Sequence, residues 1–511
     1  MKSFFKIDTN LFYIISTCKQ YFCILVFKHW DTRTVFSYLL FSFLLFVNLI
    51  PVFAQEPSSY IVIDSIFAEG TQKTKLHYLL RELDFESGDT IPLEKMDRRF
   101  GKSRNSLINT NLFNGVLIDT ISCEGNKCDV VLFMEERWRI FPIPQVEVAS
   151  QNYNVWIREQ NADLRRLTYG GFVNIYNLRG VGESFQGYIM RGYRNILETT
   201  YTFPYVDKKK RIGLSAKFIF RTDKQISADS RDNKIAFYPS DSIAAFTKKV
   251  LAKRWIGNLT MKRRIGINHN HFLRLRFHTM KIDREVADFN PHYFNNGKLN
   301  QSYFALMYNY ERDFRDFQSY PLTGNYFRFS IEKYGLGIFK DLNTFNAILD
   351  YSLYQNVAHR LFLAGNIKAY RSFGKEQPYF NNNQIGYSYS FIRGYEYYIV
   401  TTQQYFFFRT NLRYQFVNLQ FQNPLKQVSK KGGKIIIDIY LRVFAESANV
   451  KDRFFGENNP LNNSWLFGSG VALDFILWEN IPMSIEYTIN REKEYGIYVH
   501  LGLLWDFWRK T

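Results

Sequence analysis

The chain has 511 residues, a formal net charge of +19, 46% hydrophobic residues and 18% aromatic residues. This length would allow several domains, but a single all-β barrel can use as many residues. Lys and Arg are spread along alternating segments and form no patch, so nucleic-acid binding is not indicated, whereas the aromatic excess suggests the girdles of a membrane protein.

Residues 1–54 are predicted to be a signal or leader segment. Basic residues precede an apolar run over residues 35–50, and Ala54 supplies the small residue that signal peptidase needs before Gln55. A permanent membrane helix is the less favoured alternative, because the run is short and Pro51 follows it. No cysteine follows the run, so a lipid anchor is not expected.

Residues 55–139 are predicted to form a small α+β domain with the order β-α-α-β-β. Residues 60–67 alternate as a strand, and a second helix is expected over about residues 93–107. Thr74 is placed to cap the first helix. The stripe of that helix would consist of Leu76, Leu79, Leu80 and Leu83.

Cys123 and Cys128 are the two cysteines that would remain in the mature chain. They flank a turn between two alternating runs, which indicates a hairpin. In an oxidising compartment they predict a disulfide, worth about 2 kcal/mol for so short a loop. A two-cysteine metal site is the weaker alternative, because no histidine lies near in sequence.

Five short motifs mark the α+β domain: Asp64-Ser-Ile-Phe-Ala-Glu-Gly70, Leu80-Arg-Glu-Leu83, Gly88-Asp89, Leu112-Phe113 and Glu136-Arg137. Together they resemble a POTRA domain, the periplasmic module that precedes outer-membrane assembly barrels. The resemblance implies an exposed strand edge and a helix groove that hold extended client chains by strand addition. A plain spacer is the alternative for a single copy.

Residues 140–511 are predicted to form a transmembrane antiparallel β-barrel of about sixteen strands. Prolines stop both helix and ladder at residues 138–144, and segments of about ten residues with period-two alternation follow, such as 212–221, 344–353 and 435–446. A soluble sandwich would also alternate, but its strands would be nearer six residues in length. We therefore expect a mainly β protein with lipid outside the barrel and a polar lumen.

Ile392-Arg393-Gly394-Tyr395 lies in a polar segment, residues 377–404, that is too long for a hairpin turn. Turn-like motifs precede it at residues 174–183, 201–204 and 313–324. The order of these motifs resembles the BamA/TamA type of outer-membrane barrel, also called bacterial surface antigen, over nearly all of residues 58–507.

This resemblance implies that the loop folds back into the lumen, where Arg393 meets acidic residues of the wall. The matching wall motif is Phe444-Ala-Glu446-Ser-Ala448, with Glu446 where the family usually has Asp and Ala448 where it has Gly. Alternation places Glu446 on the polar face, which predicts a charge-assisted pair with Arg393. On the preceding strand, Asn411 replaces a carboxylate that the family often has.

The last strand is predicted to be the assembly address of the chain. Gly502, Trp505 and Phe507 fit the spacing of the terminal signal that outer-membrane barrels present to the assembly machinery. Family members commonly end on the aromatic residue, whereas this chain continues to Thr511. One more wall strand is the alternative interpretation.

No enzyme is expected, because a nucleophile elbow, a phosphate-binding glycine loop and a paired-histidine zinc helix are all missing from the sequence. His269 and His271 share one face of a possible strand without a third ligand, so neither a metal nor a cofactor is predicted. Asp350 and Asp474 are interpreted as solvated groups of the lumen wall.

Three functions remain open. The resemblance favours assembly or translocation of proteins at the outer membrane, with the α+β domain in the periplasm of a Gram-negative cell. A secretion pore for one cognate protein is the second candidate, and a diffusion porin or structural barrel is the third. The expected partners are outer-membrane lipid, unfolded or secreted client proteins at the POTRA-like domain, and accessory envelope proteins.

Overall fold

The computed structural model describes residues 60–148, 153–240, 249–386, 392–422, 434–477 and 481–501. The predicted leader and the predicted terminal signal (Gly502, Trp505, Phe507) lie outside the described residues. Across these described ranges, no helix is both long enough and apolar enough to cross a membrane.

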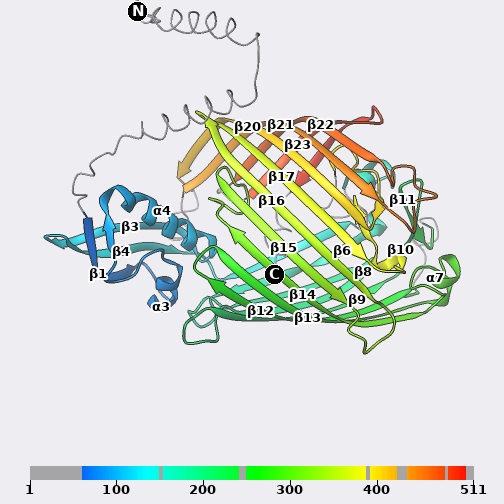
Figure 1. Ribbon diagram of the computed structural model, residues 1–511, viewed down its shortest axis with the longest axis horizontal. Helices are drawn as coiled ribbons and strands as arrows, with labels where there is room; N and C mark the ends of the chain where they lie inside the picture. The colour runs from blue at the N-terminus through cyan, green and yellow to red at the C-terminus, as the bar shows by residue number, and fades with distance from the viewer. Residues whose placement is uncertain are drawn as a thin grey trace, which may run out of the picture. The chain divides into compact units, whose positions relative to one another are not determined.

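The N-terminal α+β domain contains a four-stranded sheet with the strand order β2-β1-β4-β3 (Figure 1). Strands β1 and β4 run parallel, and the other neighbours are antiparallel. Two helices and a 3-10 turn complete the domain. Its elements are β1 (Tyr60–Glu69), α3 (Leu76–Leu79), η1 (Leu80–Glu82), β2 (Thr90–Pro92), α4 (Leu93–Asn109), β3 (Phe113–Glu124) and β4 (Lys127–Glu136).

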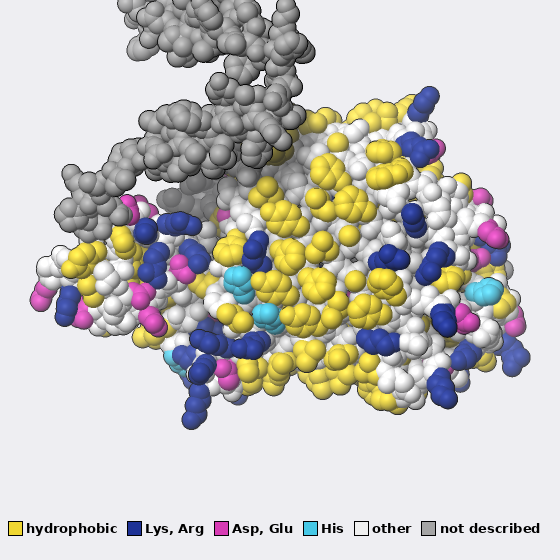
Figure 2. Space-filling model, viewed as in Figure 1, with side chains coloured by type: hydrophobic (Ala, Val, Ile, Leu, Met, Phe, Trp, Pro, Cys, Tyr) yellow, Lys and Arg dark blue, Asp and Glu magenta, His cyan; other side chains and the backbone are white. Residues whose placement is uncertain are grey.

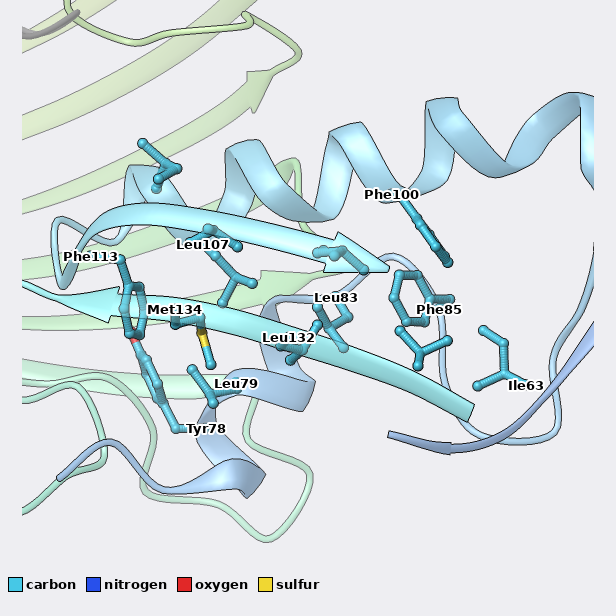
Figure 3. Packing of buried hydrophobic residues seen from close by; sticks show 14 of the residues in the cluster. Ile63, Tyr78, Leu79, Leu83, Phe85, Phe100, Leu107, Phe113, Leu132 and Met134 are labelled. Carbon is cyan, nitrogen blue, oxygen red and sulfur yellow. The ribbon is translucent and has the colours of Figure 1, made fainter. Parts of the chain in front are cut away.

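Helix α4 contributes Phe100, Leu107 and Ile108 to the hydrophobic core of this domain. Figure 3 shows Phe100 and Leu107 reaching from the helix toward the sheet, where Leu132 and Met134 of β4 lie. Leu107 and Leu132 have no exposed surface, and burial of a Leu side chain contributes about 1.5–3 kcal/mol. The domain therefore has its own core, and the predicted second helix is confirmed.

The first helix of the domain is much shorter than predicted. Its N-cap is Lys75, which makes no side-chain cap, and the helix ends at Leu79. Thr74 does not cap it, because the Thr74 hydroxyl donates instead to Glu136 Oε1 at 2.6 Å. Two of the four residues of the predicted apolar stripe, Leu79 and Leu83, are buried. The other two, Leu76 and Leu80, are exposed, so that part of the prediction is wrong.

The hairpin of β3 and β4 carries Cys123 and Cys128, which are joined by a disulfide. Cys128 is buried beside the core, and the bridge closes the end of the hairpin away from the α4–β3 connection. The bond restricts the unfolded chain and so stabilises the hairpin.

We expect the cysteines of the mature protein to be unreactive until the bridge is reduced. A maleimide added to the denatured, unreduced chain extracted from cells should label neither Cys123 nor Cys128, and it should label both after reduction. Labelling without a reductant would contradict the bridge. Mass spectrometry of the labelled peptide provides the measurement.

Sixteen strands form one antiparallel sheet that curls into a barrel (Figure 1). The predicted strand number and fold class are thus confirmed. Strand lengths range from 7 residues in β24 to 19 in β20. The strands are β5 (Ile140–Val148), β6 (Leu167–Tyr176), β7 (Ser184–Gly192), β8 (Arg194–Phe203), β9 (Ile212–Asp223), β12 (Ala252–Ile265), β13 (His269–Ile282), β14 (Asn300–Asp313), β15 (Gly324–Tyr334), β16 (Thr344–Ala358), β17 (Leu361–Phe373), β20 (Gln404–Gln422), β21 (Lys434–Lys451), β22 (Trp465–Leu477), β23 (Ile481–Asn490) and β24 (Tyr495–Leu501).

The barrel wall is apolar outside and polar inside. On β12, Trp255, Leu259 and Met261 are exposed on the outer face, whereas Arg254 and Asn258 point inward. Hydrophobic side chains cover the outside of the strands in Figure 2. This arrangement is the one that a membrane-spanning barrel requires.

The two end strands of the sheet, β5 and β24, define a seam. Within the described residues, β5 pairs with β6 and β24 pairs with β23, while no ladder joins β5 to β24. The short helix α5 (Tyr153–Arg158) follows β5 and contacts β24. Among the described residues, the seam is therefore the place where this sheet has edge strands.

A hairpin of β10 (Ile226–Arg231) and β11 (Lys234–Tyr238) is tied to other connections at the barrel end remote from the α+β domain. Asn233 at its tip is fully buried and donates to the Ile399 carbonyl oxygen at 3.1 Å and to Asn462 Oδ1 at 3.0 Å. Its own side-chain oxygen accepts from the Leu461 amide at 2.8 Å. These bonds join three connections into one cap.

Candidate functional site

The loop between β17 and β20 folds back among the inward-facing residues of the barrel. Ile392 and Tyr395 are 1% and 2% exposed. They share a hydrophobic cluster with wall residues that include Phe407, Ala448 and Leu466. Ala448 is thus part of the surface on which the loop packs.

Arg393 extends from this loop to the wall strands. Its Nη1 lies 2.5 Å from Glu446 Oε1, and its backbone amide donates to Glu446 Oε2 at 3.1 Å. Nη1 also donates to Asn411 Oδ1 at 3.2 Å, and Nε lies 3.0 Å from Glu486 Oε2. The structure thus brings the predicted pair together, and Asn411 is a further acceptor for Arg393.

Two glycines allow the loop backbone to approach the wall. Gly394 has a φ of 90°, and its carbonyl oxygen accepts from Asn490 Nδ2 at 2.7 Å. Gly468 of β22 is more restrictive, because a Cβ at this position would lie 1.8 Å from the Arg393 carbonyl oxygen. Only glycine fits between the loop and β22 at this point.

A second arginine lies beside the first. Arg442 of β21 is 3% exposed and pairs with Asp474 through Nε at 2.7 Å and Nη2 at 2.9 Å. Its Nη2 also pairs with Glu486 at 2.7 Å. Asp474 is therefore a buried ion-pair member, which corrects the interpretation of this residue as a solvated wall group.

Asp474 also accepts a hydrogen bond from the connection between β14 and β15. Tyr320 lies in the connection between β14 and β15, and its hydroxyl donates to Asp474 Oδ2 at 2.8 Å. The Tyr320 ring packs under Arg413, whose Nη1 donates to the Pro321 carbonyl oxygen at 2.8 Å. This turn therefore enters the barrel and meets the same ion network as the long loop.

Glu396, Glu486 and His500 bring possible ligand atoms within 4.8 Å of one another. Burial raises the pKa of Glu396, and His500, whose Nε2 lies 3.6 Å from Glu396 Oε1, opposes this rise. Glu486 is already paired with Arg393 and Arg442, so a metal ion would be repelled by two guanidinium groups. We interpret the cluster as the attachment of the loop to β23 and β24.

Tyr397 of the same loop reaches residues on both sides of the seam. Its ring centroid lies 5.9 Å from the Arg158 guanidinium at the end of α5. The Tyr498 ring of β24 lies 5.5 Å away on the other side. The loop therefore contacts both elements that flank the unpaired edges.

The α+β domain docks on the barrel through the connection between β6 and β7. Asn177 Nδ2 donates to Thr74 Oγ1 at 2.8 Å, and the Lys75 amide donates to the Gly180 carbonyl oxygen at 2.9 Å. A Cβ on Gly182 would lie 2.3 Å from the Tyr78 ring. Thr74 thus serves this junction rather than a helix end.

A salt bridge secures the other side of the junction. Arg264 Nη1, at the end of β12, lies 2.8 Å and 2.7 Å from the two carboxylate oxygens of Glu82. Arg264→Glu should weaken the docking of the domain by about 3 kcal/mol, because Glu82 would stay buried beside a like charge. Hydrogen exchange of residues 76–82 provides the measurement, and the exchange rates should rise.

The matched control for this prediction is the exchanged pair. Arg264→Glu combined with Glu82→Arg restores opposite charges and should recover most of the protection. Equal exchange in the single and double variants would contradict a direct pairing. Arg263→Glu, on the outer face of the same strand, should leave residues 76–82 unchanged.

The sequence interpretation placed some residues correctly and missed others. His269 and His271 face outward and contact the tyrosine hydroxyls of Tyr310 and Tyr308, each at 2.8 Å. Glu486 and Gly468 were not predicted as site residues. The carboxylate of Glu486 between Ile485 and Tyr487 is the one local signal for an inward-facing acid.

No protein-family model and no curated protein matches this sequence. Among solved structures, CdiB from Escherichia coli matches with 10% identity and a TM-score of 0.51, over 86% of this chain and 74% of that chain. BamA from Haemophilus ducreyi lacking POTRA domains 1–3 matches with 15% identity and a TM-score of 0.49, over 86% and 83%. The likeness to CdiB confirms the predicted barrel fold, and at this identity it concerns the fold alone.

Proposed function

We propose that this chain, which shares its fold with CdiB, assembles or translocates proteins at the bacterial outer membrane. The observation that carries the proposal is the loop held by Arg393 across Glu446 and Glu486, inside a sixteen-stranded barrel whose described residues form no ladder between β5 and β24. A diffusion pore has no need of a buried loop that contacts both sides of such a seam.

The seam offers a route for handling strands. Backbone groups on the facing edges of β5 and β24 have no ladder partner between these two strands in the described residues. An incoming client strand can satisfy them by β-augmentation, as at any exposed sheet edge. The loop contacts from Tyr397 to Arg158 and Tyr498 would then regulate the separation of the edges.

The α+β domain supplies a second edge. Strand β3 is 12 residues long, lies at the end of its sheet, and exposes Leu117 and Ile121. We assign this edge to extended client segments, with accessory envelope proteins as further candidates. The domain would lie in the periplasm, beside the membrane in which the apolar outer face of the barrel is embedded.

A dedicated secretion pore is the second candidate. It is favoured by one observation, namely that a single α+β domain precedes the barrel within the described residues. The capped end and the inserted turn would have to move to open a path. In both candidates the buried arginines have a structural role, and we assign no catalytic residue and no cofactor.

Depletion of the protein in its own cells distinguishes these functions. A parallel decline of many outer-membrane barrels, measured by quantitative proteomics of isolated membranes, is the result expected for assembly. Loss of one exported protein with normal membrane composition would favour the dedicated pore. Unchanged membrane and exported proteins, with altered solute uptake, would overturn the proposal.

A further inference from the structure

Basic side chains project into the lumen from β9, β12, β13, β15 and β17. Arg221 and Arg254 are directly opposite each other on β9 and β12, and Arg276 follows on β13. Across β15 to β17, the register aligns Arg328, Asp350 and Lys368. The basic arc is defined as the cations of this region: Arg221, Arg254, Arg274, Arg276, Arg328 and Lys368.

Three of the six cations of the basic arc are positioned by hydrogen bonds to neutral groups. Arg274 donates to the Thr260 hydroxyl at 3.1 Å, Arg276 donates to Asn258 Oδ1 at 2.9 Å, and Arg328 donates to the Ser330 hydroxyl at 3.1 Å. Arg221 pairs instead with Asp223, and Arg254 and Lys368 lie over aromatic rings, those of Phe380 and Tyr405. Among the described residues, the other members of the arc form no ion pair, so these bonds fix the cations without neutralising them.

The arrangement places like charges together. Arg254 faces Arg221 across the β9–β12 ladder, and a like-charged pair in this position is destabilising. Arg274 also lies within electrostatic range of Arg276 and Arg328. Because like charges placed together lower the stability of the barrel, stabilisation of the fold does not explain the basic arc.

Acidic groups of the barrel compensate for only part of this charge. Glu446, Asp474 and Glu486 lie on β21 to β23, where three arginines, Arg393, Arg409 and Arg442, already pair with them. Glu311, Glu332 and Asp350 are the acids interspersed with the arc on β14 to β16, and Arg328 lies opposite both Glu311 and Asp350 in the ladders. A concave wall with an excess of positive charge, surrounded by lipid of low dielectric constant, concentrates the opposite charge in its interior.

We propose that the basic arc makes the lumen a binding surface for acidic, extended polypeptide segments. The inference rests on the proposed function, which supplies polypeptide as the substrate, and adds the class of segment that the barrel accepts. Carboxylates of such a segment would take the remaining donors of the guanidinium groups. A segment rich in Lys and Arg would be repelled from the same wall.

The test measures the luminal potential with a single thiol. Ile256 is half-buried on the inner face of β12 between Arg254 and Asn258, and it has no polar group to lose. In Ile256→Cys, prepared in a chain that starts at Gln55, Cys123 and Cys128 stay blocked by their disulfide. The measured quantity is the rate ratio, the reaction rate of an anionic methanethiosulfonate divided by that of its cationic analogue. This ratio should be at least about tenfold higher for the Ile256→Cys thiol than for free cysteine.

Matched variants assign that preference to the arc. Arg254→Gln with Arg276→Gln should bring the rate ratio toward the value for free cysteine, whereas Arg254→Lys with Arg276→Lys should retain it. Lys253→Gln, on the outer face beside Arg254, should have no effect. A ratio that is equal to that of free cysteine, or that is unchanged in the Gln variants, would overturn the inference.

The last measurement identifies the ligand class. A 20-residue peptide rich in Asp and Glu should slow modification of the Ile256→Cys thiol, and its Asn and Gln analogue should not. Protection by a phosphorylated glycan but not by the acidic peptide would overturn the assignment to polypeptide. These outcomes do not depend on the depletion experiment, so assembly activity can stand even if the luminal preference fails.

Discussion

Arg393→Ala should destabilise the folded barrel by about 3 kcal/mol, because it leaves Glu446 and Glu486 buried with fewer cations. Both carboxylates are nearly inaccessible, at 3% and 2% side-chain exposure. The loss is limited because Arg442 still pairs with Glu486 and Arg409 lies 3.7 Å from Glu446. The midpoint temperature of the folded-to-unfolded gel shift in detergent provides the measurement.

A double-mutant cycle separates the pair from general damage. Glu446→Ala alone should also lower the midpoint, and the Arg393→Ala, Glu446→Ala double variant should lose less than the sum of the two single losses. Arg263→Ala, on the outer face of β12, is the control and should change little. Strictly additive losses would show that Arg393 and Glu446 do not stabilise each other.

Gly468→Ala should release the loop from the wall without removing any charge. The new Cβ would lie 1.8 Å from the Arg393 carbonyl oxygen, so loop and strand cannot keep their present positions. Displacement of the loop separates Arg393 from Glu446, and we expect a stability loss close to that of Arg393→Ala. Limited proteolysis within residues 392–403 should accelerate in the folded variant.

The control is a glycine with open space. A Cβ on Gly257 of β12 would meet nothing within 4 Å, so Gly257→Ala should leave both stability and proteolysis near those of the wild type. Combining Gly468→Ala with Arg393→Ala should add little, because the first change already separates the pair. Full additivity, or an unchanged proteolysis rate for Gly468→Ala, would contradict the close approach.

The local periodicity of the sequence was enough to predict the barrel, but it was not enough to predict every partner. Alternation identified Glu446 as inward-facing, and a motif indicated Arg393, so both members of that pair could be predicted from local sequence. Asp474 has the same alternation, yet it was interpreted as solvated. Its partner, Arg442, is fixed by the β21–β22 register, a long-range property that neither segment reveals alone.

Thr74 shows the same limit in the α+β domain. A threonine before a leucine-rich segment predicts an N-cap by a local rule, and that rule would hold in an isolated helix. In the structure, Glu136 lies 62 residues away in the chain and accepts from the Thr74 hydroxyl. Asn177 of the barrel then donates to the same hydroxyl, so two distant segments override the local preference.

The position of the loop in the chain has a consequence for the time order of folding. Its wall partners Glu446, Gly468, Glu486 and Asn490 all follow it in sequence, the last by nearly a hundred residues. Such contacts are slow to form, because loop closure over long separations precedes any stabilisation. Burial of Ile392 and Tyr395 should therefore be a late kinetic phase, which begins only after the final hairpins have paired.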